Sequence, residues 1–126
     1  MGKHKILIVE DNEDFLRPLK IRLENKDFEV IAADDGYSGY EIAKQERPDL
    51  IIMDVVLPNV DGFQACRLLK SDTYLKDTPI IMISGLKKDE ADREKGLTAC
   101  GADEYLLKPL DHVELINTIN KLIPQK

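Results

Sequence analysis

Three acidic residues, a serine and a lysine each follow an apolar stretch of strand length. In an open sheet of parallel strands the carboxyl ends meet at one edge, which predicts that these side chains converge. Two carboxylates about 5 Å apart repel each other by roughly 3 kcal/mol at an effective dielectric of 20, so the cluster requires a cation. Oxygen ligands in an incomplete shell suit Mg²⁺, and Mn²⁺ is an alternative ion. The residues are Glu10, Asp11, Asp54, Ser84 and Lys108.

Together these groups favour the transfer of a phosphoryl group onto a carboxylate. A carboxylate serves as the nucleophile, and the protein mainly aligns the reactants and neutralises charge on the transferring group. Alone, Glu10 and Asp11 would be interpreted as acids that cap a helix. Asp54 alone would be a turn residue, and Lys108-Pro109 alone would be a loop. Only the joint spacing favours a site at the end of the sheet.

Five apolar stretches of strand length alternate with helical patterns along the chain. Three of them are apolar without alternation, as are strands buried on both faces of a parallel sheet. Right-handed crossovers then predict an α/β fold, namely a flavodoxin-like, open, doubly wound (βα)5 sheet with the parallel strand order 2-1-3-4-5. No repeat or linker divides residues 1–126, so we expect one domain. The stretches are 6–9, 29–33, 50–53, 80–83 and 104–107.

Helices are expected in the connections between these strands and after the last one. The first should begin after Asn12, the second should run over about 38–46, and the third should begin near Gly62. The fourth should run over about 88–97, and the last should begin after Asp111. Asn12 and Asp111 are typical N-cap residues. The fourth helix is almost entirely charged, so its apolar contact with the sheet should be small and it should move most easily.

The composition is that of an ordinary folded protein, with 43% hydrophobic and 33% charged residues. No apolar stretch approaches the roughly 20 residues of a transmembrane helix and no signal peptide is visible, so we expect a cytoplasmic protein without membrane insertion. A net charge of −6 and scattered lysines argue against direct binding to nucleic acid. Cys66 and Cys100 lie far apart in the sequence without a metal or redox motif, which favours purely structural thiols.

Short motifs stand at the ends of the predicted strands and in the segments that follow them. They are Val9-Glu10-Asp11, Asp54, Leu57-Pro58, Asp61-Gly62-Phe63, Ser84-Gly85, Gly101-Ala102-Asp103 and Lys108-Pro109. With these motifs the chain resembles the receiver domain of response regulators, from its first strand to its last helix. Glu10 stands where the family more often has aspartate, and Ser84 where it more often has threonine.

The resemblance implies that Asp54 is the phosphoacceptor. It also implies that Glu10 and Asp11 hold the metal ion together with Asp54 and the backbone carbonyl of Val56. The phosphoryl donor would be a sensor histidine kinase or a histidine phosphotransfer protein of a two-component phosphorelay. The chain would be a monomer when unphosphorylated, either as a stand-alone response regulator or as a receiver module of a longer response regulator or hybrid kinase.

The resemblance further implies a switch that responds to the phosphoryl group. Ser84 and Lys108 would contact the phosphoryl oxygens, with a cis peptide bond before Pro109. Ser84 and Tyr105 would then move together, although Tyr105 is equally interpretable as a half-buried aromatic residue of a strand. The movement would alter the face formed by the fourth helix, the fifth strand and the last helix, and so control a protein partner.

Three other classes of protein share parts of this pattern. A phosphatase with an aspartyl nucleophile would place a second aspartate two residues after Asp54, but Val56 stands there, so we expect no turnover enzyme. A flavodoxin-like electron carrier would need a Ser/Thr/Gly-rich loop after the first strand, where the acids of 10–14 would repel its phosphate. The complete set of acids, hydroxyl and lysine argues against a module that works without phosphorylation.

The residues beside the acceptor bear on how long a phosphoryl group would persist. Hydrolysis of an aspartyl phosphate needs a water molecule in line behind the phosphorus. Val56 and Leu86 stand two residues after Asp54 and Ser84, and both side chains are apolar. Because neither can hold or activate this water, we expect slow self-dephosphorylation.

Overall fold

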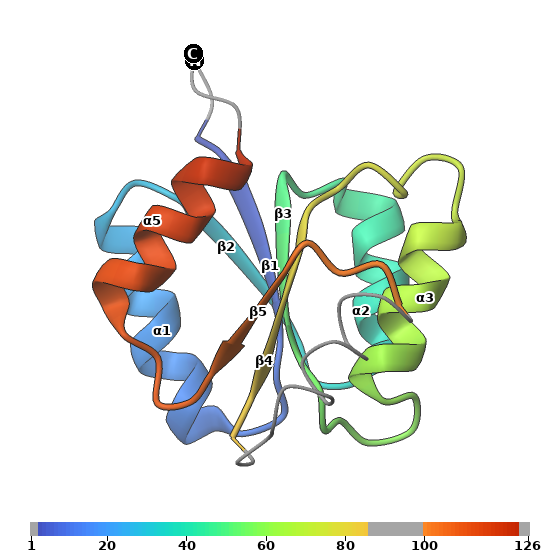
Figure 1. The fold of residues 1–126 in the computed structure, drawn as a ribbon, viewed down its shortest axis with the longest axis horizontal. Helices are drawn as coiled ribbons and strands as arrows, with labels where there is room; N and C mark the ends of the chain where they lie inside the picture. Colours follow the sequence, from blue (N-terminus) through green and yellow to red (C-terminus); the bar gives the residue numbers. More distant parts are fainter. Residues whose placement is uncertain (1–2, 86–99, 124–126) are drawn as a thin grey trace.

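The computed structural model describes residues 3–85 and 100–123. Within these ranges, parallel strands form one sheet in the order β2-β1-β3-β4-β5, which confirms the predicted α/β fold and strand order (Figure 1). The expected fourth helix at 88–97 and Leu86 lie outside the described residues. The strands are β1 Lys5–Val9, β2 Glu29–Ala33, β3 Leu50–Asp54, β4 Ile80–Ser84 and β5 Glu104–Leu107.

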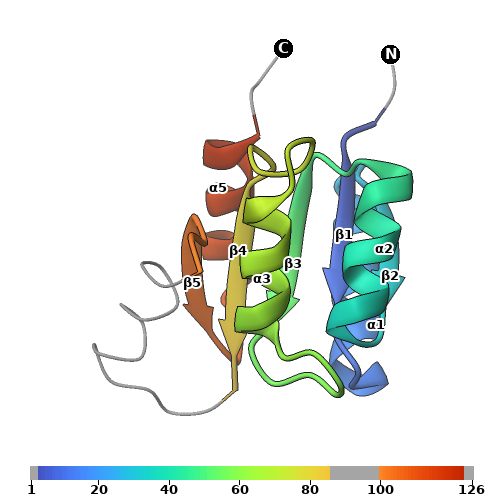
Figure 2. The same ribbon diagram turned by 90° about the vertical axis from the view of Figure 1, so that its right-hand side faces the viewer.

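The helices of the described ranges pack on both faces of the sheet: α1 Glu13–Asn25, α2 Gly36–Glu46, α3 Gly62–Ser71 and α5 His112–Leu122. In Figure 1, α1 and α5 cover one face and α2 and α3 the other; Figure 2 is turned so that α2 and α3 lie in front of the sheet. Asn12 and Asp111 cap α1 and α5, as predicted. α2 begins two residues before the predicted Ser38, because the side chain of Asp35 accepts a hydrogen bond from Ser38 N at 2.7 Å and caps the helix there. Among these helices none has both the length and the apolar character needed to cross a membrane.

Alternate residues of the central strands face two separate hydrophobic cores. In β1, Ile6 and Ile8 pack on the side of α1 and α5, whereas Leu7 and Val9 pack on the side of α2 and α3. Every residue of β3 and of β4 is buried. Because both faces of these strands lie against helices, their sequences are apolar without alternation.

The strands are paired in a register that brings their carboxyl ends to one edge of the sheet. Val9 is paired with Met53, so the residues that follow them, Glu10 and Asp54, stand at the same level. Asp54 in turn is paired with Ile83. Ser84 is paired with Leu107, directly before Lys108. The sheet therefore places the predicted site residues beside one another.

Two glycines allow α2 and α3 to approach the segment that follows β3. A Cβ atom at Gly62 would overlap the carbonyl oxygen of Asp54, and one at Gly36 would overlap the carbonyl oxygen of Val60. The backbone N–H of Gly62 also donates to Val55 O at 2.9 Å. Since no side chain fits at either position without displacing backbone, the glycines hold the chain around Asp54 in place.

Candidate functional site

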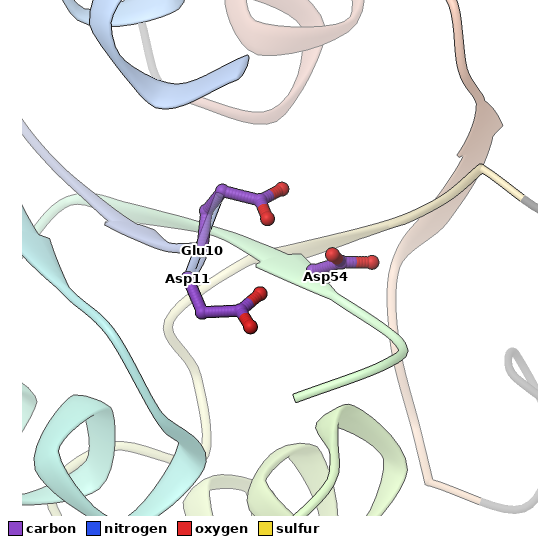
Figure 3. Close-up of side chains that lie close together, drawn as sticks. All are labelled: Glu10, Asp11 and Asp54. Carbon is purple, nitrogen blue, oxygen red and sulfur yellow. The ribbon is translucent and has the colours of Figure 1, made fainter. Parts of the chain in front are cut away.

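Three carboxylates meet where β1 and β3 end. Glu10, Asp11 and Asp54 each offer one oxygen, and these oxygens all lie within 4.8 Å of one another. Figure 3 shows the carboxylates of Glu10 and Asp11 extending from the end of β1 toward the side on which Asp54 lies. Glu10 is 1% exposed and Asp54 6%, whereas Asp11 is exposed. Two of the three charges are therefore held where water solvates them poorly.

Backbone hydrogen bonds fix the two buried acids. The N–H of Glu10 donates to Ala33 O at 2.9 Å, which continues the contact between β1 and β2 beyond the end of β1. The Oε2 atom of Glu10 accepts from Asn12 N at 3.1 Å. The Oδ1 atom of Asp54 accepts from Val56 N at 3.3 Å. Each buried carboxylate thus has one oxygen held by the loop that follows its own strand.

Lys108 brings positive charge to both buried acids. Its Nζ donates to Glu10 Oε1 at 2.9 Å and to Asp54 Oδ2 at 3.3 Å. The same Nζ lies 4.1 Å from the centre of the Phe15 ring, a cation–π distance. The backbone N–H of Lys108 donates to Ser84 O at 2.7 Å, which fixes the start of its side chain at the end of β4. The lysine is thus held from the sheet and from α1.

The charges of this cluster are only partly balanced. Burial raises the pKa of Glu10 above its usual value, and the hydrogen bond from Lys108 offsets this effect in part. Burial lowers the pKa of Lys108, but the hydrogen bond to Glu10 and the charge of Asp54 outweigh it and leave that pKa raised. The ion pair therefore favours the charged lysine, while the Glu10 carboxylate still carries a net cost of burial.

The other predicted site residues lie around this cluster. Ser84 is the last residue of β4 and is buried, and Val56 is 57% exposed. Tyr105 is 4% exposed, so it is a core residue of β5 and not half-buried, and within the described part of the chain its hydroxyl has no hydrogen-bond partner. The peptide bond before Pro109 is cis. Leu86 lies outside the described residues.

Two contributors to the site were not predicted from the sequence. Phe15 falls within the helix expected after Asn12, but no sequence pattern pairs it with Lys108. The sequence placed Gly62 in a motif and near the start of a helix, whereas the structure shows that it also lies against the backbone of Asp54. The available signal in the sequence was that Gly62 directly follows Asp61, the N-cap residue of α3, where a glycine permits close approach of another backbone segment.

The acidic cluster fits a divalent cation that prefers oxygen ligands. Its three carboxylate oxygens lie close enough to share one ion, and Asp11 keeps its contact with solvent. When bound there, such an ion supplies positive charge against the repulsion of the acids. Lys108 supplies a second positive charge to Asp54. The chemistry that this arrangement suits is attack by a carboxylate on a phosphoryl group, whose negative charge the cations would offset.

Known proteins share both the sequence pattern and the fold. The family model of the response regulator receiver domain matches residues 6–120. Protein PilH of Pseudomonas aeruginosa is 38% identical, with 94% of this chain and 97% of PilH covered. Response regulator ArlR of Staphylococcus saprophyticus is 39% identical over 97% of this chain, which spans about half (54%) of ArlR. The receiver domain of sensor histidine kinase PA1611 from P. aeruginosa, solved with a magnesium ion coordinated in its active site cleft, has a TM-score of 0.87 and 30% identity, with 96% of this chain and 98% of that one covered.

Removal of the Lys108 ammonium should destabilise the folded chain in a pH-dependent way. Without divalent cations at pH 7, we expect Lys108→Ala to lower the free energy of unfolding by about 1–3 kcal/mol, because Glu10 keeps a buried charge without its cation. The pKa of Glu10 should rise further in the variant. A carboxyl group whose pKa is raised by folding destabilises the folded state at pH values above that raised pKa, but not below the pKa of the unfolded state. The difference in unfolding free energy between variant and wild type should therefore shrink as the pH falls through the raised pKa of Glu10. Urea unfolding at several pH values measures this.

Lys121→Ala is the matched control for this experiment. Lys121 Nζ lies 2.9 Å from Glu104 Oε2, but the lysine side chain is 65% exposed. Loss of an exposed pair should cost less than about 1 kcal/mol. If Lys108→Ala costs no more than Lys121→Ala, or if its cost grows as the pH falls, the electrostatic account of the cluster is wrong.

Proposed function

The chain belongs to the response regulator receiver domain family, and we propose that it is a phosphorylation-dependent switch that accepts a phosphoryl group on Asp54. The observation that carries the proposal is the position of this side chain. Asp54 is almost fully buried, shares the acidic cluster with Glu10 and Asp11, and receives the ammonium of Lys108 at 3.3 Å. A carboxylate between acids and a lysine is suited to receive phosphoryl groups and not merely to end a strand.

The proposed reaction joins an oxygen of Asp54 to the phosphorus of a phosphohistidine donor. As this bond forms, the bond between phosphorus and the donor's imidazole nitrogen breaks, and the imidazole leaves. Lys108 and the hydroxyl of Ser84 then contact the phosphoryl oxygens. Lys108 already touches Asp54, and Ser84 ends the neighbouring strand, which supports both assignments.

Mg²⁺ is the proposed ion, and Mn²⁺ is the alternative. Glu10, Asp11, Asp54 and the backbone carbonyl of Val56 would hold it. The mutual approach of the three carboxylates supports the first three ligands, and the magnesium ion in the related PA1611 receiver domain supports the choice of ion. Val56 follows Asp54 closely, and its N–H already binds the Asp54 carboxylate.

The proposed partners are those of two-component signalling. Receiver domains interact with sensor histidine kinases or histidine phosphotransfer proteins, and one of these is the expected donor. A downstream protein would read the phosphorylated state in the cytoplasm, with the unphosphorylated chain a monomer. We infer no turnover of an external substrate, because Val56 stands where an aspartyl phosphatase needs a second aspartate and its side chain has no acid or base.

The proposed switch links the phosphoryl group to β5. A new anion beside Ser84 and Lys108 would draw the end of β4 toward it. Ser84 is paired with Leu107 of β5, the strand that also carries Tyr105. Tyr105 is buried with a hydroxyl that lacks a partner among the described residues, so a second position of this ring can gain a hydrogen bond. The face that includes β5 and α5 would then present a different surface to the partner.

Substitution of Asp54 tests the acceptor. Asp54→Asn should abolish labelling by a small phosphoryl donor in the presence of Mg²⁺, because the amide is not a nucleophile.

Asp11→Asn should weaken Mg²⁺ binding on the order of tenfold or more through loss of a ligand, measured by calorimetric titration. Asp14→Asn is the control: this acid lies nearby in the first turn of α1 but is not part of the cluster. A label retained by Asp54→Asn, or equal weakening by the two other variants, would refute these roles.

Amide hydrogen exchange tests the switch. With Mg²⁺ and fluoroberyllate, a mimic of the phosphoryl group, exchange should change at Ser84 and along β5, because both lie next to the new anion. The amides of β2, at the far side of the sheet, should not change. Asp54→Asn should abolish the response. Unchanged exchange at Ser84 and throughout β5 in the wild-type chain would contradict the mechanism.

The lifetime of the phosphorylated state tests the role of Val56. Its side chain is exposed beside the acceptor and can shield the phosphorus from water. Val56→Asn combined with Leu86→Glu should speed loss of the label on the order of tenfold or more, because these side chains can hold and activate a water molecule. The dependence on Mg²⁺ should stay the same. A double variant that keeps its label as long as wild type would show that these positions do not set the rate.

A further inference from the structure

The two cysteines of the chain meet in the core although they are far apart in the sequence. Cys66 lies in α3 and Cys100 precedes β5, and both belong to the hydrophobic core on that side of the sheet. The thiol of Cys66 donates to the carbonyl oxygen of Cys100 at 3.4 Å. The two thiols are close enough that each shifts the pKa of the other. The sequence has no third cysteine, so all of its thiols are found at this one contact.

The contact makes the two thiols chemically unequal. The hydrogen bond with Cys66 lowers the pKa of Cys100 to about 7 against the effect of burial, and the backbone N–H of Ala102 acts in the same direction. The same hydrogen bond, together with burial, raises the pKa of Cys66 far above its usual value. Cys100 therefore has the character of a nucleophile and Cys66 that of the protonated thiol beside it.

The two cysteines also differ in their exposure to solvent, and this difference again favours Cys100 as the residue that reacts. Cys100 keeps an exposed fraction of 3%, whereas Cys66 is completely buried. This small difference favours Cys100 as the thiol that a small oxidant meets first. The thiol of Cys66 is held beside Cys100 by its hydrogen bond to the Cys100 carbonyl, which suits the arrangement of a reactive cysteine with a resolving cysteine.

A neighbouring ion pair holds the two cysteine-bearing segments together. Lys70 of α3 binds Asp103 at 3.0 Å, and its aliphatic chain lies against Gly101. The Asp103 carboxylate also accepts from Ile80 N at 2.8 Å, which anchors the pair to the start of β4. Because disulfides require close and specific approach of the two residues, this anchoring favours bond formation without separation of α3 from the sheet.

We propose that Cys66 and Cys100 form a dithiol site that hydrogen peroxide oxidises to an intramolecular disulfide. The Cys100 thiolate attacks one peroxide oxygen, the O–O bond breaks, and hydroxide leaves while Cys100 becomes a sulfenic acid. The Cys66 sulfur then attacks the Cys100 sulfur, the S–S bond forms as the S–O bond of the sulfenic acid breaks, and the hydroxyl group leaves as water with the Cys66 proton. In total the thiols lose two electrons and two protons, and the peroxide becomes two water molecules. The reaction uses no residue of the acidic cluster.

The disulfide would tie α3 to the segment that leads into β5. This link closes the chain between Cys66 and Cys100, which restricts the unfolded state and should raise the temperature of unfolding. It also fixes the beginning of the strand that carries Tyr105. The oxidised and reduced chains should therefore differ in stability and in the freedom of β5.

Peroxide treatment of the folded, reduced chain is the first experiment. After alkylation of the remaining thiols in denaturant, the intact mass should show the loss of two hydrogen atoms and no alkylation. Peptide mapping should join Cys66 to Cys100, dithiothreitol should reverse the change, and the oxidised form should unfold at a higher temperature. Asp54→Asn should oxidise at the same rate. The proposal fails if both thiols remain free to alkylate at a peroxide dose that oxidises the urea-unfolded chain, or if the only disulfides join two chains.

Matched variants test the separate roles of the two cysteines. Cys66→Ser keeps a hydrogen-bond donor beside Cys100 and should accumulate sulfenic acid there, trapped with dimedone. Cys66→Ala removes the donor and should react severalfold more slowly. Cys100→Ser should leave Cys66 unreactive in the folded chain, with urea unfolding used to verify that each variant is folded. Equal reactivity of Cys66 in Cys100→Ser and of Cys100 in Cys66→Ser would overturn the assignment of roles.

Discussion

The contact of one lysine with two buried carboxylates is the interaction on which the site depends. Glu10 and Asp54 lie at the ends of adjacent strands, and without a cation their negative charges would repel each other in a poorly solvated position. Lys108 contacts both and is itself supported by the ring of Phe15. Even so, burial leaves the pKa of Glu10 raised, so the charge of the cluster is not fully offset. An acidic cluster in this state favours the binding of a divalent cation, whose charge would complete the balance.

The sheet makes this unfavourable arrangement of charges possible. Its central strands are buried on both faces, and two hydrophobic cores supply the stability that the carboxylates reduce. Close approach of α3 at Gly62 fixes the backbone of Asp54. Asp54 is therefore held by rigid elements, whereas Val56 is exposed in the segment beyond the end of β3.

β5 connects the two chemically distinct regions of the molecule. Its carboxyl end leads to Lys108 in the acidic cluster, and Cys100 precedes its first residue beside α3. Tyr105, between them, packs in the same core as both cysteines. The proposed phosphoryl group at one end and the proposed disulfide before the other would therefore act on one strand of four residues.

The sequence by itself determined the strand order, the edge at which the acids meet and most helix starts within the described ranges, because these follow from local apolar periodicity, N-cap residues and the rules of parallel sheets. It misplaced the start of α2 by two residues, because Asp35, whose side chain accepts from Ser38 N, caps the helix before the predicted start. Only the tertiary structure decided that Lys108 lies against Phe15 and that Cys66 touches Cys100. Such contacts join residues distant in the chain, and they depend on the packing of side chains between helix and sheet, for which no local pattern of residues exists.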